Sequence, residues 1–145
     1  MNFKMLRAGE LLALSGAICL AVSLFEPWYH GIIGTLNLWD TFGPGAVLLL
    51  VALLGALTLV ASAVADRSTA LPVSSGVWCV LLSLVGLVAA IVRLVERPEH
   101  AGSLSIGPWL ALAGTIAIGV GAWESLRDER QSLYTRGEPA PRPRP

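Results

Sequence analysis

The chain has 145 residues, of which 54% are hydrophobic and only 14% are charged, and its formal net charge is zero. This composition excludes an ordinary soluble domain, and the balanced charge gives no indication of nucleic-acid binding. The mean hydropathy of +0.69 is typical of a protein embedded in a lipid bilayer.

Charged residues are rare in segments at about 8–25, 44–65, 73–95 and 108–126. Crossing a hydrocarbon layer of about 30 Å takes about 20 helical residues, which is close to the length of each segment. The segments lack the polar and apolar alternation of barrel strands. We therefore predict an all-α, four-transmembrane-helix bundle over residues 1–126 with two outward-facing loops. Residues 127–145 are polar and end in EPAPRPRP, which predicts a disordered cytoplasmic tail.

The first segment also has features of a signal peptide. Lys4 and Arg7 precede an apolar run that contains the small-x-small triplet Ala21–Ser23. However, Pro27-Trp28-Tyr29 follows directly, and the apolar run is long for a signal sequence. We expect an uncleaved first helix.

Small residues recur every four positions in the first and last segments, a spacing that lets helix backbones approach closely in lipid. Glu10 lies beside the first of these stripes. An acid in a membrane helix is a candidate functional group, although in the first turn it also complements the helix dipole. We favour this structural role and keep Glu10 as a candidate acid at the membrane edge. The stripes are Gly9, Ala13, Ala17 and Ala21, and Ala113, Ala117 and Gly121.

The loop Glu26–Gly45 is the longest break between apolar segments on its side of the chain. Trp28 is expected at the membrane interface, which amphipathic aromatic rings prefer. Asn37 and Asp40 have the spacing of a capping box, so a short helix is predicted to begin near Leu38. The second loop contains SLSIGP, which echoes TLNL and the later Gly-Pro of the first loop.

Cations are distributed unevenly between the two sides of the predicted bundle. Lys4, Arg7, Arg67 and the tail arginines lie on one side, and Arg93 and Arg97 lie on the other. The positive-inside rule then predicts a multi-pass protein of the cell (plasma) membrane, with both termini in the cytoplasm.

Arg93 is the basic residue that falls inside an apolar segment, where an unpaired cation is costly. Asp40 is expected at a similar depth, so we predict an Asp40–Arg93 ion pair, with Glu26 or Glu96 as competing partners. The pair would dock the loop on the bundle or form a small outward-facing polar pocket. The predicted rim of this pocket consists of Trp28, Trp39 and Trp109.

The sequence does not predict a metal, a cofactor or a catalytic site. His30 and His100 have no ligand-like spacing. Cys19 and Cys79 are expected at different depths and form no CxxC motif, so we interpret them as small core residues. A non-enzymatic role is therefore expected.

Several short motifs occur in order: RAGELLALSGA, LFEPWY, LNLWDTF, VRLVERP and GPWLALAG followed by RDE. Together they resemble a group of small four-helix integral membrane proteins of actinobacteria and related high-GC bacteria, whose function is not established. The resemblance implies the topology and no activity. The chain departs from the pattern at Glu26, where an apolar residue is expected before Pro27.

The leading interpretation is an accessory or interaction protein that acts through its outer Trp-rich loop or its cytoplasmic tail. Its expected partners are the lipid bilayer and either another membrane protein or a second copy of the chain. One alternative is a small-molecule transporter or efflux subunit, which would use Glu10. Another alternative is a sensor of the state of the envelope or membrane.

Overall fold

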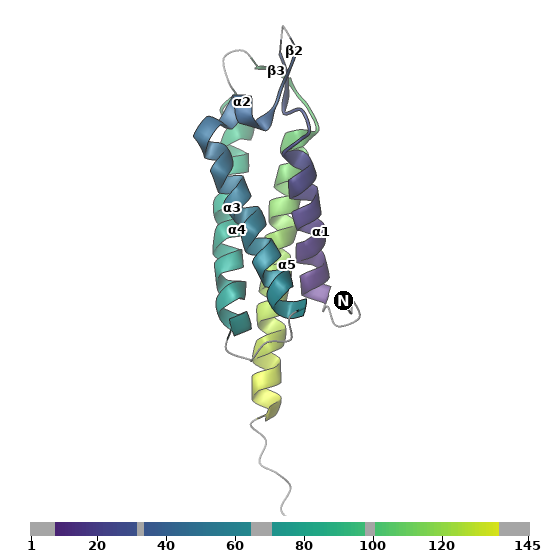
Figure 1. The fold of residues 1–145 in the computed structure, drawn as a ribbon, viewed down its shortest axis with the longest axis vertical. Coiled ribbons are helices and arrows are strands. Elements are labelled where there is room, and N and C mark those ends of the chain that lie inside the picture. Colours follow the sequence, from purple (N-terminus) through teal and green to yellow (C-terminus); the bar gives the residue numbers. More distant parts are fainter. Residues whose placement is uncertain (1–7, 32–33, 65–70, 98–100, 137–145) are drawn as a thin grey trace, which may run out of the picture.

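The computed structural model describes residues 8–31, 34–64, 71–97 and 101–136, most of which are helical. Four long helices lie side by side in an elongated bundle (Figure 1). A three-stranded sheet and a short helix cover one end, which we call the capped end. The long helices are α1 (Ala8–Ser23), α3 (Ala46–Val64), α4 (Leu71–Val95) and α5 (Gly107–Arg136). The cap consists of β1 (Tyr29–Gly31), β2 (Gly34–Leu36), α2 (Leu38–Phe42), the 3-10 turn η2 (Gly43–Gly45) and β3 (Ala101–Leu104).

Three helical stretches are long and apolar enough to cross a membrane: Ala46–Val64, Gly76–Val95 and Gly107–Asp128. Helix α1 is also apolar, but its 16 described residues fall short of that length. The prediction of apolar membrane helices is therefore confirmed for three of the segments. A fourth crossing by α1 stays a prediction.

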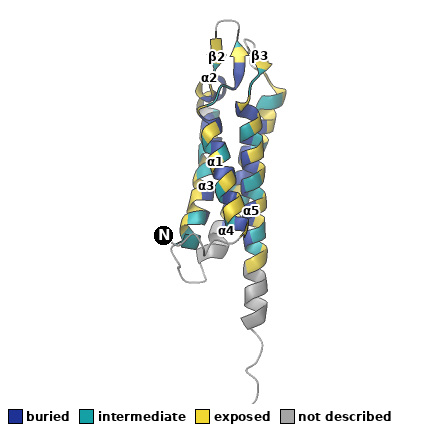
Figure 2. Ribbon diagram, turned by 90° about the vertical axis from the view of Figure 1, so that its right-hand side faces the viewer, coloured by how far each residue is buried: buried dark blue, intermediate teal, exposed yellow. Residues whose placement is uncertain are grey.

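The bundle is apolar on its outside as well as on its inside. Buried positions follow the interior of the bundle, and exposed positions line its outer faces (Figure 2). Many exposed positions carry large apolar side chains, such as Leu54, Leu84 and Val88. A helix that is hydrophobic all round is typical of a membrane span, because lipid replaces water as its solvent.

Helices α1 and α5 run antiparallel in direct backbone contact. A Cβ atom placed on Gly9 would lie 2.7 Å from the carbonyl oxygen of Gly121, and one on Gly16 would lie 2.7 Å from that of Gly114. Only glycine permits such an approach. The predicted stripes thus meet within the chain at Ala117 and Gly121, whereas the predicted Ala113 is exposed and Gly114 lies against α1 in its place. Gly9, Ala13 and Gly16 are buried there and do not form a surface for a second copy.

The sheet at the capped end was not predicted. Its strand order is β2-β1-β3, and both pairings are antiparallel. Tyr29 of β1 pairs with Leu36 on one side and with Leu104 on the other. The echo between the two loops therefore marks the two strands that flank β1. This arrangement joins the loops into one unit.

Helix α5 continues ten residues beyond Leu126, to Arg136. The prediction of a disordered tail from residue 127 is wrong for this stretch. The segment up to Arg136 contains no Gly or Pro and is rich in helix-forming residues. Arg127 and Glu124 add an ion pair of 3.3 Å on one helix face. The rest of the predicted tail lies outside the described residues.

Candidate functional site

Trp28 is the centre of the cap. Its backbone N–H donates to the carbonyl of Leu36 (2.9 Å), and its carbonyl accepts from the N–H of Ser105 (3.1 Å). The side chain is fully buried, and its Nε1–H donates to the carbonyl of Ser23 at 2.8 Å. That bond satisfies a carbonyl at the C-terminal end of α1. The prediction that Trp28 lies on an exposed rim is wrong, because the sheet folds its ring inward.

Phe42, the last residue of α2, completes the aromatic core of the cap. Its ring meets the Trp28 ring edge to face, with centroids 4.8 Å apart and an interplanar angle of 85°. This is a favourable geometry for aromatic rings. Glycine at position 107 is required on the other side, since a Cβ atom there would lie 2.7 Å from Trp28 Cδ1.

Tyr29 fastens the sheet to α4. The side chain is fully buried, and its hydroxyl donates a hydrogen bond to the carbonyl of Arg93. Burial raises the pKa of Tyr29 above its ordinary value, and the positive charges of Arg93 and Arg97 partly offset this increase. The neutral phenol is therefore the form that the folded cap favours.

Asp40 serves the local structure of α2. Its carboxylate accepts a hydrogen bond from the backbone N–H of Asn37 at 3.3 Å. The predicted short helix does begin at Leu38, and the Asn37–Asp40 capping interaction is present. The Thr41 hydroxyl lies 3.0 Å from the carbonyl of Asn37 and adds a further hydrogen bond.

Arg93 and Asp40 do not form the predicted ion pair. The guanidinium of Arg93 lies over the Phe42 ring, with Cζ 5.0 Å from the centroid, which is a cation–π geometry. Among the described residues, no carboxylate lies within ion-pair distance of Arg93, so neither Glu26 nor Glu96 takes the place of Asp40. The physical reason is helical geometry: residues two apart do not share a helix face. Phe42 faces the bundle, whereas Asp40 is exposed.

The remaining predicted residues do not converge on one pocket. Trp39 is 51% exposed and Trp109 is 55% exposed, and both lie near the capped end. Glu10 lies in the first turn of α1, at the opposite end of the bundle. Arg93, in contrast, lines a groove on the outer surface of the bundle.

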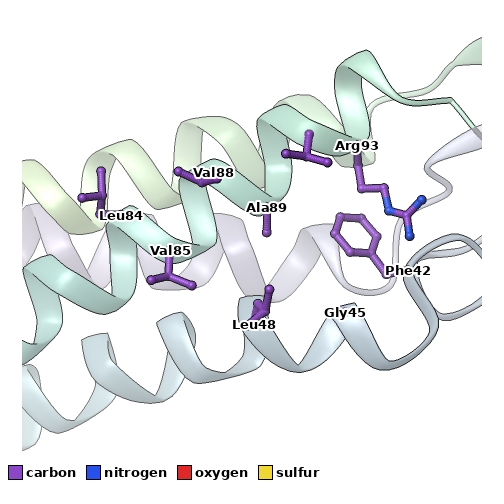
Figure 3. A pocket seen from close by; sticks show the side chains of 9 residues that line it. Phe42, Gly45, Leu48, Leu84, Val85, Val88, Ala89 and Arg93 are labelled. Atoms are coloured by element: carbon purple, nitrogen blue, oxygen red, sulfur yellow. The ribbon is translucent and has the colours of Figure 1, made fainter.

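That groove runs along the outer surface between α3 and α4 and has a volume of about 450 Å³. Its walls are apolar side chains, and Arg93 and Phe42 lie at one end (Figure 3). Leu48 contributes from α3, and Leu84, Val85 and Val88 contribute from α4. The groove therefore combines a long apolar surface with the positive charge of Arg93 at one end.

Sequence reasoning missed the roles of Tyr29 and Phe42. In the sequence both are simply aromatic residues in or beside a loop, a position that is equally typical of aromatic side chains at a membrane interface.

Within the described part of the chain, no group of three or more His, Cys, Asp or Glu side chains could hold a metal ion. No family model, curated protein or solved structure matches this chain.

Proposed function

We propose that the chain is a non-enzymatic, four-span protein of the cell membrane that acts as an accessory protein by docking a partner onto its cap. Both termini lie in the cytoplasm in this proposal, and the cap faces outward. The observation that carries it is the union of the two loops into one three-stranded sheet at the end of the bundle.

The packing of α1 supports a fourth crossing. Gly9, at the start of α1, lies against Gly121, and Trp28, just beyond its end, lies against Gly107. The stretch from residue 9 to residue 28 therefore lies alongside the apolar stretch Gly107–Asp128. A membrane that encloses this part of α5 also encloses α1, since the two backbones touch.

Two exposed tryptophans of α5 support the proposed position of the membrane along the bundle. Trp109 and Trp123 are both more than half exposed and lie 14 residues apart on α5, which is about 21 Å along a helix. The two rings lie toward opposite ends of the apolar stretch Gly107–Asp128, which is where interfacial tryptophans are expected. The excess of cations in the sequence on the side opposite the cap favours a cytoplasmic location for that side.

The cap has the properties of a docking platform. Trp28 and Tyr29 anchor it from below, while His30, Thr35 and Ser103 are exposed on its strands. Strands β2 and β3 each have one neighbour in the described sheet, so each has an edge that can accept another strand. Trp39 adds a half-exposed ring of the type that is enriched at protein interfaces.

The test is affinity capture of the full chain from its native membrane with an N-terminal tag. Trp39→Ala should reduce capture of a stoichiometric partner at least tenfold if this ring anchors the contact. Trp78→Ala is the matched control, because Trp78 is also more than half exposed but lies toward the opposite end of the bundle. The amount of partner captured with Trp78→Ala should equal that captured with the natural chain.

A shortened chain without residues 131–145 locates the contact further. Loss of the partner from this chain, but not from Trp39→Ala, would move the contact to the cytoplasmic side and refute docking on the cap. Capture of no stoichiometric partner would refute the accessory role. The transporter alternative would then be tested with Glu10→Gln, which should abolish substrate-dependent proton flux if Glu10 carries the proton.

A further inference from the structure

The groove between α3 and α4 occupies half the depth of the predicted membrane. It extends along α4 from Leu84 to Arg93. Those nine residue steps cover about 14 Å at 1.5 Å per residue. Arg93 is near the end of the apolar stretch Gly76–Val95, and Leu84 is near its middle. One leaflet of a hydrocarbon layer about 30 Å thick measures about 15 Å, so the groove has the length of one leaflet.

The walls of the groove suit a hydrocarbon chain. Leu48, Leu84, Val85 and Val88 are each more than 40% exposed, and none carries a polar group. On a helix that crosses a membrane, such side chains face lipid. An acyl chain is the apolar molecule that is always present at this depth and runs parallel to the helices.

The end of the groove suits an anion. Arg93 is partly exposed, and in the described parts of the chain it has no carboxylate partner. Phe42 holds its guanidinium from one side, and the Tyr29 hydroxyl fixes its backbone carbonyl. The planar guanidinium presents several N–H donors in a geometry that matches phosphate oxygens. Arg97, exposed just beyond the end of α4, adds a second positive charge at this end.

We propose that this groove is a binding site for one anionic phospholipid, with an acyl chain along α3 and α4 and the phosphate on Arg93. The inference rests on the proposed insertion in a membrane but not on partner docking. The lipid would complete the groove and neutralise a cation that has no carboxylate partner among the residues that the structure describes.

A second groove on the same protein provides an internal comparison. It lies between α4 and α5, has a volume of about 300 Å³ and is lined by residues such as Leu87, Ile116 and Val120. No charged side chain lines it. Lipid in this groove should therefore show no preference for an anionic headgroup.

The experiment is native mass spectrometry of the full chain, released from nanodiscs that contain equal amounts of phosphatidylglycerol and phosphatidylcholine with identical acyl chains. One Arg near a membrane surface changes the affinity for anionic lipid by about fivefold. Arg93→Gln should therefore lower the ratio of retained phosphatidylglycerol to phosphatidylcholine about fivefold. Arg93→Lys, which keeps the charge, should retain most of the preference.

Two further variants separate the site from general electrostatics and from misfolding. Val88→Trp fills the groove and should reduce retention of the first lipid molecule, whereas Val120→Trp fills the other groove and should leave the ratio unchanged. Arg127→Gln removes an exposed charge at the opposite end and should have no effect. Helix content by circular dichroism should be the same for all variants.

An unchanged lipid ratio in Arg93→Gln would refute the site, and so would an equal loss in Arg127→Gln. Inorganic phosphate added in excess should not displace the lipid, and displacement would show that the site recognises a free anion instead. These outcomes are independent of the docking proposal, because Arg93→Gln should still capture the partner that Trp39→Ala loses.

Discussion

Gly16→Ala should force α1 and α5 apart. A Cβ atom at this position would lie 2.7 Å from the carbonyl oxygen of Gly114 and 2.7 Å from the backbone nitrogen of Ile118. Ordinary contacts of a Cβ atom begin at 3.4 Å, so the two helices must separate by roughly 0.7 Å. Both obstacles are backbone atoms, which cannot move aside by changing a side-chain rotamer.

This separation has a cost that can be estimated. A gap of 0.5–1 Å forfeits roughly a quarter to a half of the dispersion energy of the contacts that it opens. The affected interface contains Gly9, Ala13 and Leu20, all buried. Overpacking of this kind costs about 1–3 kcal/mol, and because the obstacle is rigid we expect a loss of about 2 kcal/mol or more. The gain in helix propensity from glycine to alanine, about 1 kcal/mol, is already included in this net figure.

The assay is reversible unfolding in mixed micelles by titration with dodecyl sulfate, followed by circular dichroism. Gly119→Ala is the matched control, because Gly119 lies inside α5 and its added Cβ would meet only the hydroxyl of Ser83 at 3.0 Å. That hydroxyl donates to the carbonyl of Val80 at 2.8 Å, so it can move aside only by weakening this bond. The lost hydrogen bond and the gain in helix propensity are each about 1 kcal/mol, so Gly119→Ala should change the stability by less than about 1 kcal/mol in either direction. Equal stability of the two variants would refute the direct backbone contact between α1 and α5.

Two further predictions concern the cap. Tyr29→Phe should reduce the free energy of unfolding by about 1 kcal/mol, because the hydrogen bond to the carbonyl of Arg93 is lost. The raised pKa of Tyr29 means that the folded protein holds the phenol proton more tightly than the unfolded chain does. Its stabilising contribution is therefore complete below about pH 10 and declines as the pH rises through the higher folded-state pKa. Denaturation at several alkaline pH values should show a smaller decline for Tyr29→Phe than for the natural chain, and equal declines would contradict burial of this hydroxyl. Asp40→Ala and Arg93→Gln should destabilise the protein independently, with a coupling free energy below about 0.5 kcal/mol in a double-mutant cycle. A coupling above about 1 kcal/mol would show that the two side chains form an ion pair after all.

Sequence reasoning located the features that depend on local composition. Three of the apolar segments are long apolar helices in the structure, with boundaries close to those predicted. The short helix at Leu38 follows from the capping spacing of Asn37 and Asp40, which lie within one turn of each other. The small-residue stripe of α1 lies on the face that packs against α5, although on α5 the contact runs through Gly114 and not through the predicted Ala113. Each of these signals lies within a single continuous stretch of chain, so periodicity and hydropathy can detect it.

Only the tertiary structure decided how the cap is built. Strand β1 has three residues and β3 has four, which is too short for an alternating pattern to stand out. The pairing of Tyr29 with Leu104 joins residues 75 positions apart, and it depends on α1 and α5 bringing Pro27 next to Gly107. The same folding buries Trp28 and places Phe42, rather than Asp40, against Arg93. Hydropathy indicates that a side chain prefers lipid or core, but which residues meet there is determined by the packing of whole helices.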